Sequence, residues 1–295
     1  MKKSPIDLWT RFWFGSAPPD LLGICRFFFF ILLFLRQFPK DFSFLSHISP
    51  VFWTPILPFR ITSGPPTRLI EFIQYGQIVW KISLLTSALG LFSRGSTALA
   101  ALLGMCIIGL EQSLSDTSHS AYLTICTLLL FAFAKCGDAF SLDKQIKGNL
   151  ATQNNFEYYW PIQLGRALHA SLYFGSAVAK LRHGGVAWIV SDGFSVLLKQ
   201  SYVLRPYPYP LTWWVSEHSI LCEFLTLSTV LLELSAPLAL FNRSFRRVLL
   251  PALLVLHIGI YCLMGIGFWV FAGLFIFWLP VGLKLNHRKL SPQII

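Results

Sequence analysis

Four side chains that can ionise or form hydrogen bonds lie at helical spacing within one apolar stretch, residues 166 to 181. Arg166, His169, Tyr173 and Lys180 are at positions i, i+3, i+7 and i+14, so they share one face of a helix with 3.6 residues per turn. A charge at the centre of a membrane helix costs roughly 2.5 to 3.5 kcal/mol, so this face needs partners, water or a task. The alternative is that Arg166 and Lys180 lie near the helix ends and extend to the lipid headgroups.

Lys180 is the residue on this face best suited to chemistry. Near the extracytoplasmic end of its helix and surrounded by apolar groups, the side chain loses solvation, and this loss favours the neutral amine. A neutral amine can act as a general base. His119 and His257 can exchange hydrogen bonds with a neutral, oxygen-bearing ligand, or each can be a satisfied structural residue.

Two further ionisable residues, Arg26 and Glu233, lie inside apolar segments. They have opposite charges, and pairing would relieve the cost of burying each, so we interpret them as a structural ion pair, with a catalytic role as the alternative. Six cysteines lie scattered without any C-x-x-C pair and predict neither a zinc site nor a disulfide framework. We expect no metal site.

The composition is that of a polytopic membrane protein. Of 295 residues, 55% are apolar and only 13% are charged, against about 25% charged in soluble domains. We expect one membrane domain, residues 1 to 295 with a core from 20 to 283, and no separate soluble domain. The net charge of +11 is spread in ones to threes at the ends of apolar segments. That distribution orients membrane helices in a lipid bilayer and argues against nucleic acid as a partner.

The predicted fold is an all-α bundle of about eight transmembrane helices with one interfacial or re-entrant helix. The stretch from 182 to 210 holds glycines, prolines and too few apolar residues for a span of about 20, so it supplies the interfacial helix. The loop from 136 to 161 is expected to be solvated. The predicted spans are residues 21–38, 69–92, 97–114, 119–135, 162–181, 220–241, 247–264 and 267–283.

Eight spans place both termini on one side of the membrane, together with most of the lysines and arginines outside the spans. The positive-inside rule makes that side cytoplasmic. A ninth span at residues 186 to 204 is the alternative, but it would place Arg243, Arg246 and Arg247 outside. We therefore favour eight spans, with residues 182 to 217 on the extracytoplasmic side.

Several segments together resemble one family, the horizontally transferred transmembrane (HTTM) domain, which includes the membrane domain of vitamin K-dependent gamma-glutamyl carboxylase. The matches follow chain order and identify the chain as similar to short bacterial members, which implies the bacterial inner membrane as its location. The similar segments are DLLGICRFFF at 20–29, HSAYLTICTLLLFAFAKCGDAFSLD at 119–143, LYFGSAVAKL at 172–181, LELSAPLALF at 232–241 and HIGIYCLMGIGFWVFAGL at 257–274.

The resemblance implies a role for each matching residue. The lysine matching Lys180 deprotonates a vitamin K hydroquinone; the oxygenated quinol then removes a proton from a glutamate γ-carbon, to which carbon dioxide adds. The matching histidine, His119, stabilises the carbanion or positions groups. The implied cofactor is a reduced vitamin K-like quinol such as menaquinol, with oxygen and carbon dioxide as co-substrates. The candidate cofactor-binding residues, either structural or ligand-lining, are His257, Tyr173, Glu233 and Arg26.

The chain also departs from the carboxylases. Ala179 precedes Lys180 where they carry a second lysine, and their Asn-Asn pair reads Thr117-Ser118. The large extramembrane region that presents glutamates in those enzymes is not expected here, so the peptide or protein acceptor is open, as is whether the chain is a lyase-like enzyme at all. The alternative is a non-catalytic membrane component for maturation, export or immunity of a secreted peptide, similar to the sporulation-delaying protein B family.

Overall fold

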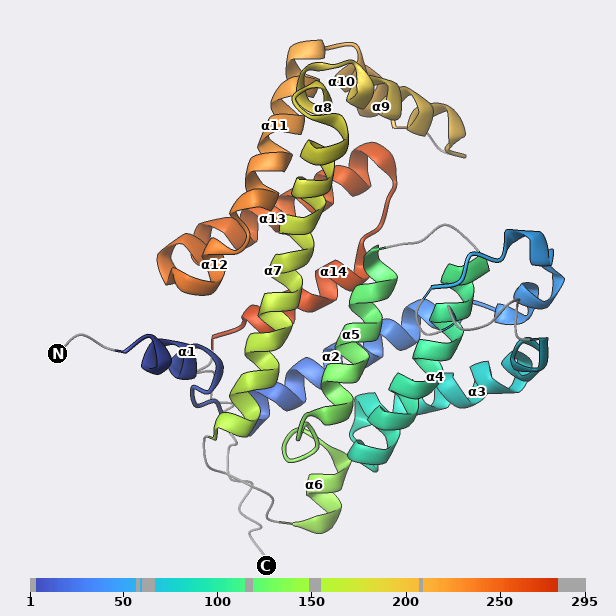
Figure 1. Ribbon diagram of the computed structural model, residues 1–295, viewed down its shortest axis with the longest axis vertical. Coiled ribbons are helices and arrows are strands. Elements are labelled where there is room, and N and C mark those ends of the chain that lie inside the picture. Colours follow the sequence, from blue (N-terminus) through green and yellow to red (C-terminus); the bar gives the residue numbers. More distant parts are fainter. Residues whose placement is uncertain are drawn as a thin grey trace, which may run out of the picture. The chain divides into compact units, whose positions relative to one another are not determined.

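The computed structural model describes residues 4 to 56, 59, 67 to 114, 119 to 148, 155 to 206 and 209 to 280. These residues are helical and contain no β-strand, apart from one isolated bridge, so the all-α prediction is confirmed (Figure 1). The elements are α1 (Pro5–Trp13), α2 (Pro19–Gln37), η1 (Phe42–His47), η2 (Pro50–Phe52), α3 (Thr67–Leu89), α4 (Ser93–Leu114), α5 (His119–Phe133), α6 (Leu142–Lys147), α7 (Phe156–Gly184), α8 (Ala187–Val190), α9 (Gly193–Leu204), α10 (Pro210–Ser216), α11 (Ser219–Ser235), α12 (Leu238–Phe241), α13 (Arg243–Met264), α14 (Trp269–Leu274) and η4 (Phe275–Trp278).

Two of the described helices, α4 and α13, are long and apolar enough to cross a membrane. The pair α10 and α11 makes a third candidate if the two helices, which meet at a bend of 97°, form one broken span. The apolar helix α5 has 15 residues, fewer than the roughly 20 that a span needs. The helices α2 and α3 are long enough but carry several charges, among them Arg26 and Lys81. The described residues thus contain two or three candidate spans, fewer than the eight predicted.

The chain divides into two compact units. The first comprises Met1–Thr117, Thr127–Leu164 and Ile276–Ile295, and the second comprises Ser118–Cys126 and Gly165–Phe275. Both α5 and α7 therefore contribute part of their length to each unit.

In the first unit, α3 packs against both α2 and α4. Trp80 on α3 is fully buried, and its indole Nε1 donates to the Ala100 carbonyl of α4 at 3.0 Å, so burying this large ring leaves no polar atom without a partner. Phe131 packs against Phe30 of α2 and stacks on Phe277 of η4, with ring centroids 5.5 and 5.8 Å apart. Aromatic side chains thus form much of the core of this unit.

Arg26 on α2 is fully buried in the first unit, and backbone carbonyls satisfy its charge. The guanidinium donates to Cys136 O at 2.6 Å, to Phe140 O at 2.5 Å and to Ala88 O at 3.5 Å. Ala88 lies in the last turn of α3, where carbonyls lack helical partners and carry partial negative charge. Arg26 therefore ties α2 to the end of α3 and to the segment after α5. This is a structural role for the two terminal nitrogens, whereas Nε is buried and has no hydrogen-bond partner among the described residues.

Asp143 holds the tight link between α3 and α4. Its carboxylate accepts hydrogen bonds from the backbone N–H groups of Phe92 and Ser93, at 2.8 and 2.7 Å, and from the Ser93 hydroxyl at 2.8 Å. A carboxylate at this place satisfies the first N–H groups of α4 and complements the positive end of the helix dipole. The sequence Ser-Leu-Asp at 141–143, which ends the family-like segment 119–143, thus caps two helices. Ser141 caps α6, and Asp143 caps α4.

In the second unit, the segment predicted to be interfacial or re-entrant, residues 182 to 210, contains α8 and α9, and together with the following helix α10 it holds the end of α13. Residues 261 to 264 end α13, and each of their carbonyls accepts a hydrogen bond from a side chain of this region. Arg205 donates to the carbonyls of Tyr261 and Cys262, at 3.1 and 3.3 Å. Thr212 donates to the carbonyl of Leu263 at 2.8 Å, and Ser201 donates to that of Met264 at 3.3 Å. Exposed apolar and aromatic side chains, among them Trp188 and Trp214, suit the predicted place at a membrane surface.

Several predicted boundaries are wrong for local reasons. The sixth predicted helix, 220–241, is broken into α11 and α12 because Pro237 has no N–H to donate to the preceding turn. The fifth begins at Phe156 rather than at residue 162, with Pro161 inside the helix. The polar loop contains the short helix α6, and the eighth predicted helix is seen as α14 and η4, with residues 281 to 295 outside the described part of the chain.

The N-terminal helix α1 was not predicted. Ser4 and Asp7 form a capping box, in which the Ser4 hydroxyl accepts from Ile6 N and the Asp7 carboxylate accepts from Ser4 N, with Pro5 at the first helical position. The sequence S-P-x-D carries this signal. Ile6 and Trp9 are exposed on this helix.

Replacing Asp143 with Asn tests the capping role. We expect Asp143→Asn to lower the free energy of unfolding by about 1.5 to 3 kcal/mol, because an amide keeps one acceptor oxygen and loses the charge assistance. The measurement is thermal unfolding of the purified chain in detergent. Asp192→Asn is the control, since Asp192 is exposed and its side chain caps no N–H of α9. Equal shifts in both variants would contradict the assignment.

Candidate functional site

The polar face predicted for residues 166 to 181 exists on α7. His169 and Tyr173 are buried on it, and Lys180 is partly buried, two turns further along. Ser176, which the sequence reading missed, lies between Tyr173 and Lys180 on the same face, so the row has the spacing 4, 3, 4 of a helix stripe. Its position four residues before the lysine was the signal that could have found it.

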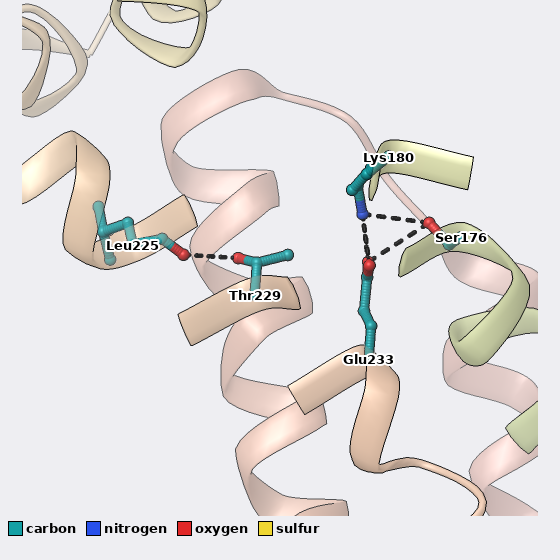
Figure 2. A network of polar contacts seen from close by, with 5 residues as sticks. All are labelled: Ser176, Lys180, Leu225, Thr229 and Glu233. Carbon is teal, nitrogen blue, oxygen red and sulfur yellow. Dashed lines mark hydrogen bonds and ion pairs between the residues drawn. The ribbon is translucent and has the colours of Figure 1, made fainter. Parts of the chain in front are cut away.

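Lys180 forms an ion pair with Glu233 of α11. Its Nζ lies 2.5 Å from Oε2 and 2.6 Å from Oε1 of the carboxylate, and it donates to the Ser176 hydroxyl at 3.1 Å. Figure 2 shows Lys180 and Ser176 converging on the Glu233 carboxylate from one helix. The lysine side chain is 21% exposed and the glutamate 8%, so this pair is largely removed from water.

The position of Glu233 explains why it requires a cation. It lies in the last turn of α11, two residues before the helix ends at Ser235, where the helix dipole is negative and disfavours a carboxylate. Lys180 compensates both the buried charge and the unfavourable dipole. Removing one partner of a buried pair costs about 3 to 5 kcal/mol, because the other charge is left uncompensated.

The prediction that Arg26 and Glu233 form a structural ion pair is wrong. Arg26 gives its guanidinium to backbone carbonyls, and Glu233 takes the ammonium of Lys180. Each of these buried charges does have partners, as expected. For the guanidinium of Arg26, however, the partners are backbone carbonyls and not a carboxylate.

Tyr173 and His257, both predicted to bind a cofactor, contact each other. The Tyr173 hydroxyl lies 2.5 Å from Nε2 of His257, which stands on α13. Nδ1 of His257 is buried and has no hydrogen-bond partner among the described residues. Whichever nitrogen carries the proton, this ring therefore keeps a buried donor or acceptor that a ligand could satisfy.

Aromatic rings surround the Tyr173–His257 contact. The ring of Phe271 lies 5.9 Å from Tyr173 and 5.5 Å from His257, and Phe268 lies 5.4 Å from His257. The ring of His169 lies 5.0 Å from Tyr173. His169, one of the four residues of the predicted polar face, therefore belongs to the same cluster.

Two other predicted residues have different outcomes. Arg166 is 2% exposed, so the interpretation of it as an anchor reaching the headgroups is wrong. His119 is the first residue of α5, and its side chain lies outside what the structure describes. Within the described residues, no group of three or more His, Cys, Asp or Glu side chains is arranged to hold a metal ion.

A cavity of about 390 Å³ lies beside α7, shares Ser176 with this face, and has the size of a small-molecule site. It is lined mainly by apolar side chains, and Ser176 belongs both to its wall and to the Lys180–Glu233 contact. The lining residues are Tyr122, Leu123, Cys126, Leu168, Ser171, Leu172, Gly175 and Ser176.

A double-mutant cycle tests the coupling of Lys180 and Glu233. Lys180→Met and Glu233→Gln should each lower the unfolding temperature. In the double variant the decrease should be clearly smaller than the sum of the two single decreases, because neither charge is then buried without its partner. Lys199→Met is the matched control: the Lys199–Glu217 pair lies in the same unit with side chains 41% and 49% exposed, and such pairs contribute at most about 1 kcal/mol. Additive losses would contradict the coupling.

Comparison of the chain with protein-family models, with curated proteins and with solved structures finds no match. The family resemblance therefore stands on the sequence motifs, and the function is argued from the geometry of the Lys180 site.

Proposed function

We propose that the chain uses Lys180 as a base toward a membrane quinol or a similar lipophilic molecule, and so initiates proton abstraction or carboxylation of an acceptor. The observation that carries this proposal is the contact of Lys180 with Glu233 and with Ser176, a residue of the cavity wall. The resemblance of the motifs around Lys180 and His257 to HTTM-type carboxylases supports the same assignment.

Glu233 gives the lysine a route to its basic form. At 2.5 Å the ammonium can pass a proton to the carboxylate, which converts the ion pair into a neutral amine and a neutral acid. The amine can then accept a proton from a hydroxyl placed in the cavity, and it returns to the ammonium form.

The residues around the cavity fit a quinol-like molecule. Three leucines, with Tyr122, Cys126 and Gly175, suit an apolar ring or chain. Ser171 and Ser176 supply hydroxyls in the wall, and Lys180 donates a hydrogen bond to Ser176. Bound there, a quinol would supply the acidic hydroxyl and the reducing electrons for the reaction with oxygen.

We also propose that the chain is a multi-pass protein of the bacterial inner membrane with eight spans and cytoplasmic termini. The two candidate spans α4 and α13 support a membrane location. The arginines at the start of α13, Arg243, Arg246 and Arg247, support the cytoplasmic side for that end.

Lys180→Arg separates chemistry from stability. Arginine can keep the ion pair with Glu233 but does not deprotonate near neutral pH, so we expect near-normal unfolding and a loss of quinol consumption of at least about 100-fold. The measurement is oxidation of menaquinol by the chain in lipid vesicles supplied with oxygen and bicarbonate. Lys199→Arg, on the exposed pair of the same unit, should leave the rate unchanged.

Undiminished quinol consumption in Lys180→Arg would overturn the proposal. Stable association with a secreted peptide that is insensitive to changes at Lys180 and His119 would instead favour the non-catalytic membrane component.

Alkaline phosphatase fusions test the topology, since the enzyme is active only outside the cytoplasm. With eight spans, a fusion after Arg205 should be active and a fusion after Asn242 inactive. With a ninth span at residues 186 to 204, both results reverse. A fusion after Ser141, which is expected to be cytoplasmic in both arrangements, is the control for background activity.

A further inference from the structure

The cavity between α5 and α7 lies wholly within the second unit and shares Ser176 with the polar face of α7. Its wall comes from the first part of α5, at Tyr122, Leu123 and Cys126, and from residues 168 to 176 of α7. Gly175 widens it: a Cβ added there would meet no atom within 4 Å. A larger side chain at position 175 would therefore extend into open space beside the cavity wall.

The hydroxyls in the wall differ in their capacity for a ligand. Ser171 donates to the carbonyl of Leu168 in its own helix at 2.9 Å, so its proton is in use. Ser176 accepts from Lys180, but its own proton makes only a 3.5 Å contact with Glu233, at the limit of a hydrogen bond. A hydroxyl has one donor and two acceptor sites, so Ser176 retains capacity for another oxygen.

We propose that this cavity binds a lipophilic molecule with a single oxygen-bearing polar end, and that Ser176 holds that oxygen. The leucines and the open space at Gly175 receive the apolar part. The oxygen then lies beside the hydroxyl that contacts both Lys180 and Glu233. The binding of this molecule does not depend on the proposed function. Only its role as a substrate of Lys180 rests on that proposal.

The binding can be tested with two photoreactive probes, a long-chain alcohol that carries a diazirine and the matching alkane without the hydroxyl. The full chain in lipid vesicles is irradiated with each, and mass spectrometry locates the label. We expect the alcohol to label residues 119 to 126 and 166 to 184 more strongly than the alkane does. Ser176→Ala should reduce that preference about 2- to 10-fold, the effect of losing one neutral hydrogen bond.

Gly175→Leu, which fills the cavity, should reduce labelling by both probes. Val178→Leu is the matched control, since Val178 is exposed on α7 and does not line the cavity. Unfolding temperatures of all variants show whether each is folded. Equal labelling of the wild-type chain by alcohol and alkane would mean that only bilayer lipid contacts this surface, and would overturn the proposal, as would unchanged labelling of a folded Gly175→Leu variant.

Labelling of Lys180→Arg separates this inference from the proposed function. If Lys180→Arg retains both the labelling and the quinol consumption, the catalytic proposal is contradicted and the binding site is supported. Lost preference for the alcohol in Ser176→Ala, with quinol consumption unchanged, would place the binding site outside the reaction.

Discussion

The contact between the Lys180 ammonium and the Glu233 carboxylate is the interaction on which the second unit depends. It joins α7 to α11 at a place where neither charge is well hydrated and where the end of α11 repels the carboxylate. An ammonium has three donors, and here two go to the carboxylate oxygens and one to Ser176. The charge of the lysine is thus accounted for by described residues, and its reactivity has to be understood through these partners.

The two units treat their buried charges differently. In the first, the two terminal nitrogens of Arg26 and the carboxylate of Asp143 are committed to backbone groups that lie at the ends of helices. Such contacts fix a fold, although Nε of Arg26 is buried without a hydrogen-bond partner among the described residues. In the second, the hydroxyl proton of Ser176 has only a long contact and Nδ1 of His257 has no partner among the described residues. The unused hydrogen-bonding capacity of the second unit thus lies on Ser176 and on the histidine that contacts Tyr173, both at the polar face of α7.

The sequence predicted the elements better than it predicted the contacts. Apolar runs located the helices that carry Arg26, Lys180 and His257, because burial of a continuous apolar stretch requires a regular hydrogen-bonded backbone. The partner of Glu233 was not predictable, since periodicity places a residue on a face of its own helix and says nothing of which helix packs against it. The break at Pro237 could have been predicted, because proline cannot donate to the preceding turn. The described helices also contain only two or three candidate spans by length and apolarity, fewer than the eight predicted from the apolar runs of the sequence.

The saturation of Lys180 determines how a ligand could reach it. Because its three donors are in use, an incoming oxygen must displace one acceptor, and the Ser176 contact at 3.1 Å is the longest of the three. A ligand hydroxyl that takes this place contacts the nitrogen directly and leaves Ser176 free to donate to the same oxygen. The exchange keeps the ion pair with Glu233 intact, so the cost of ligand entry is a neutral hydrogen bond and not a buried charge. The serine at position 176 thus lets a ligand reach the lysine without breaking the interaction that holds α7 to α11.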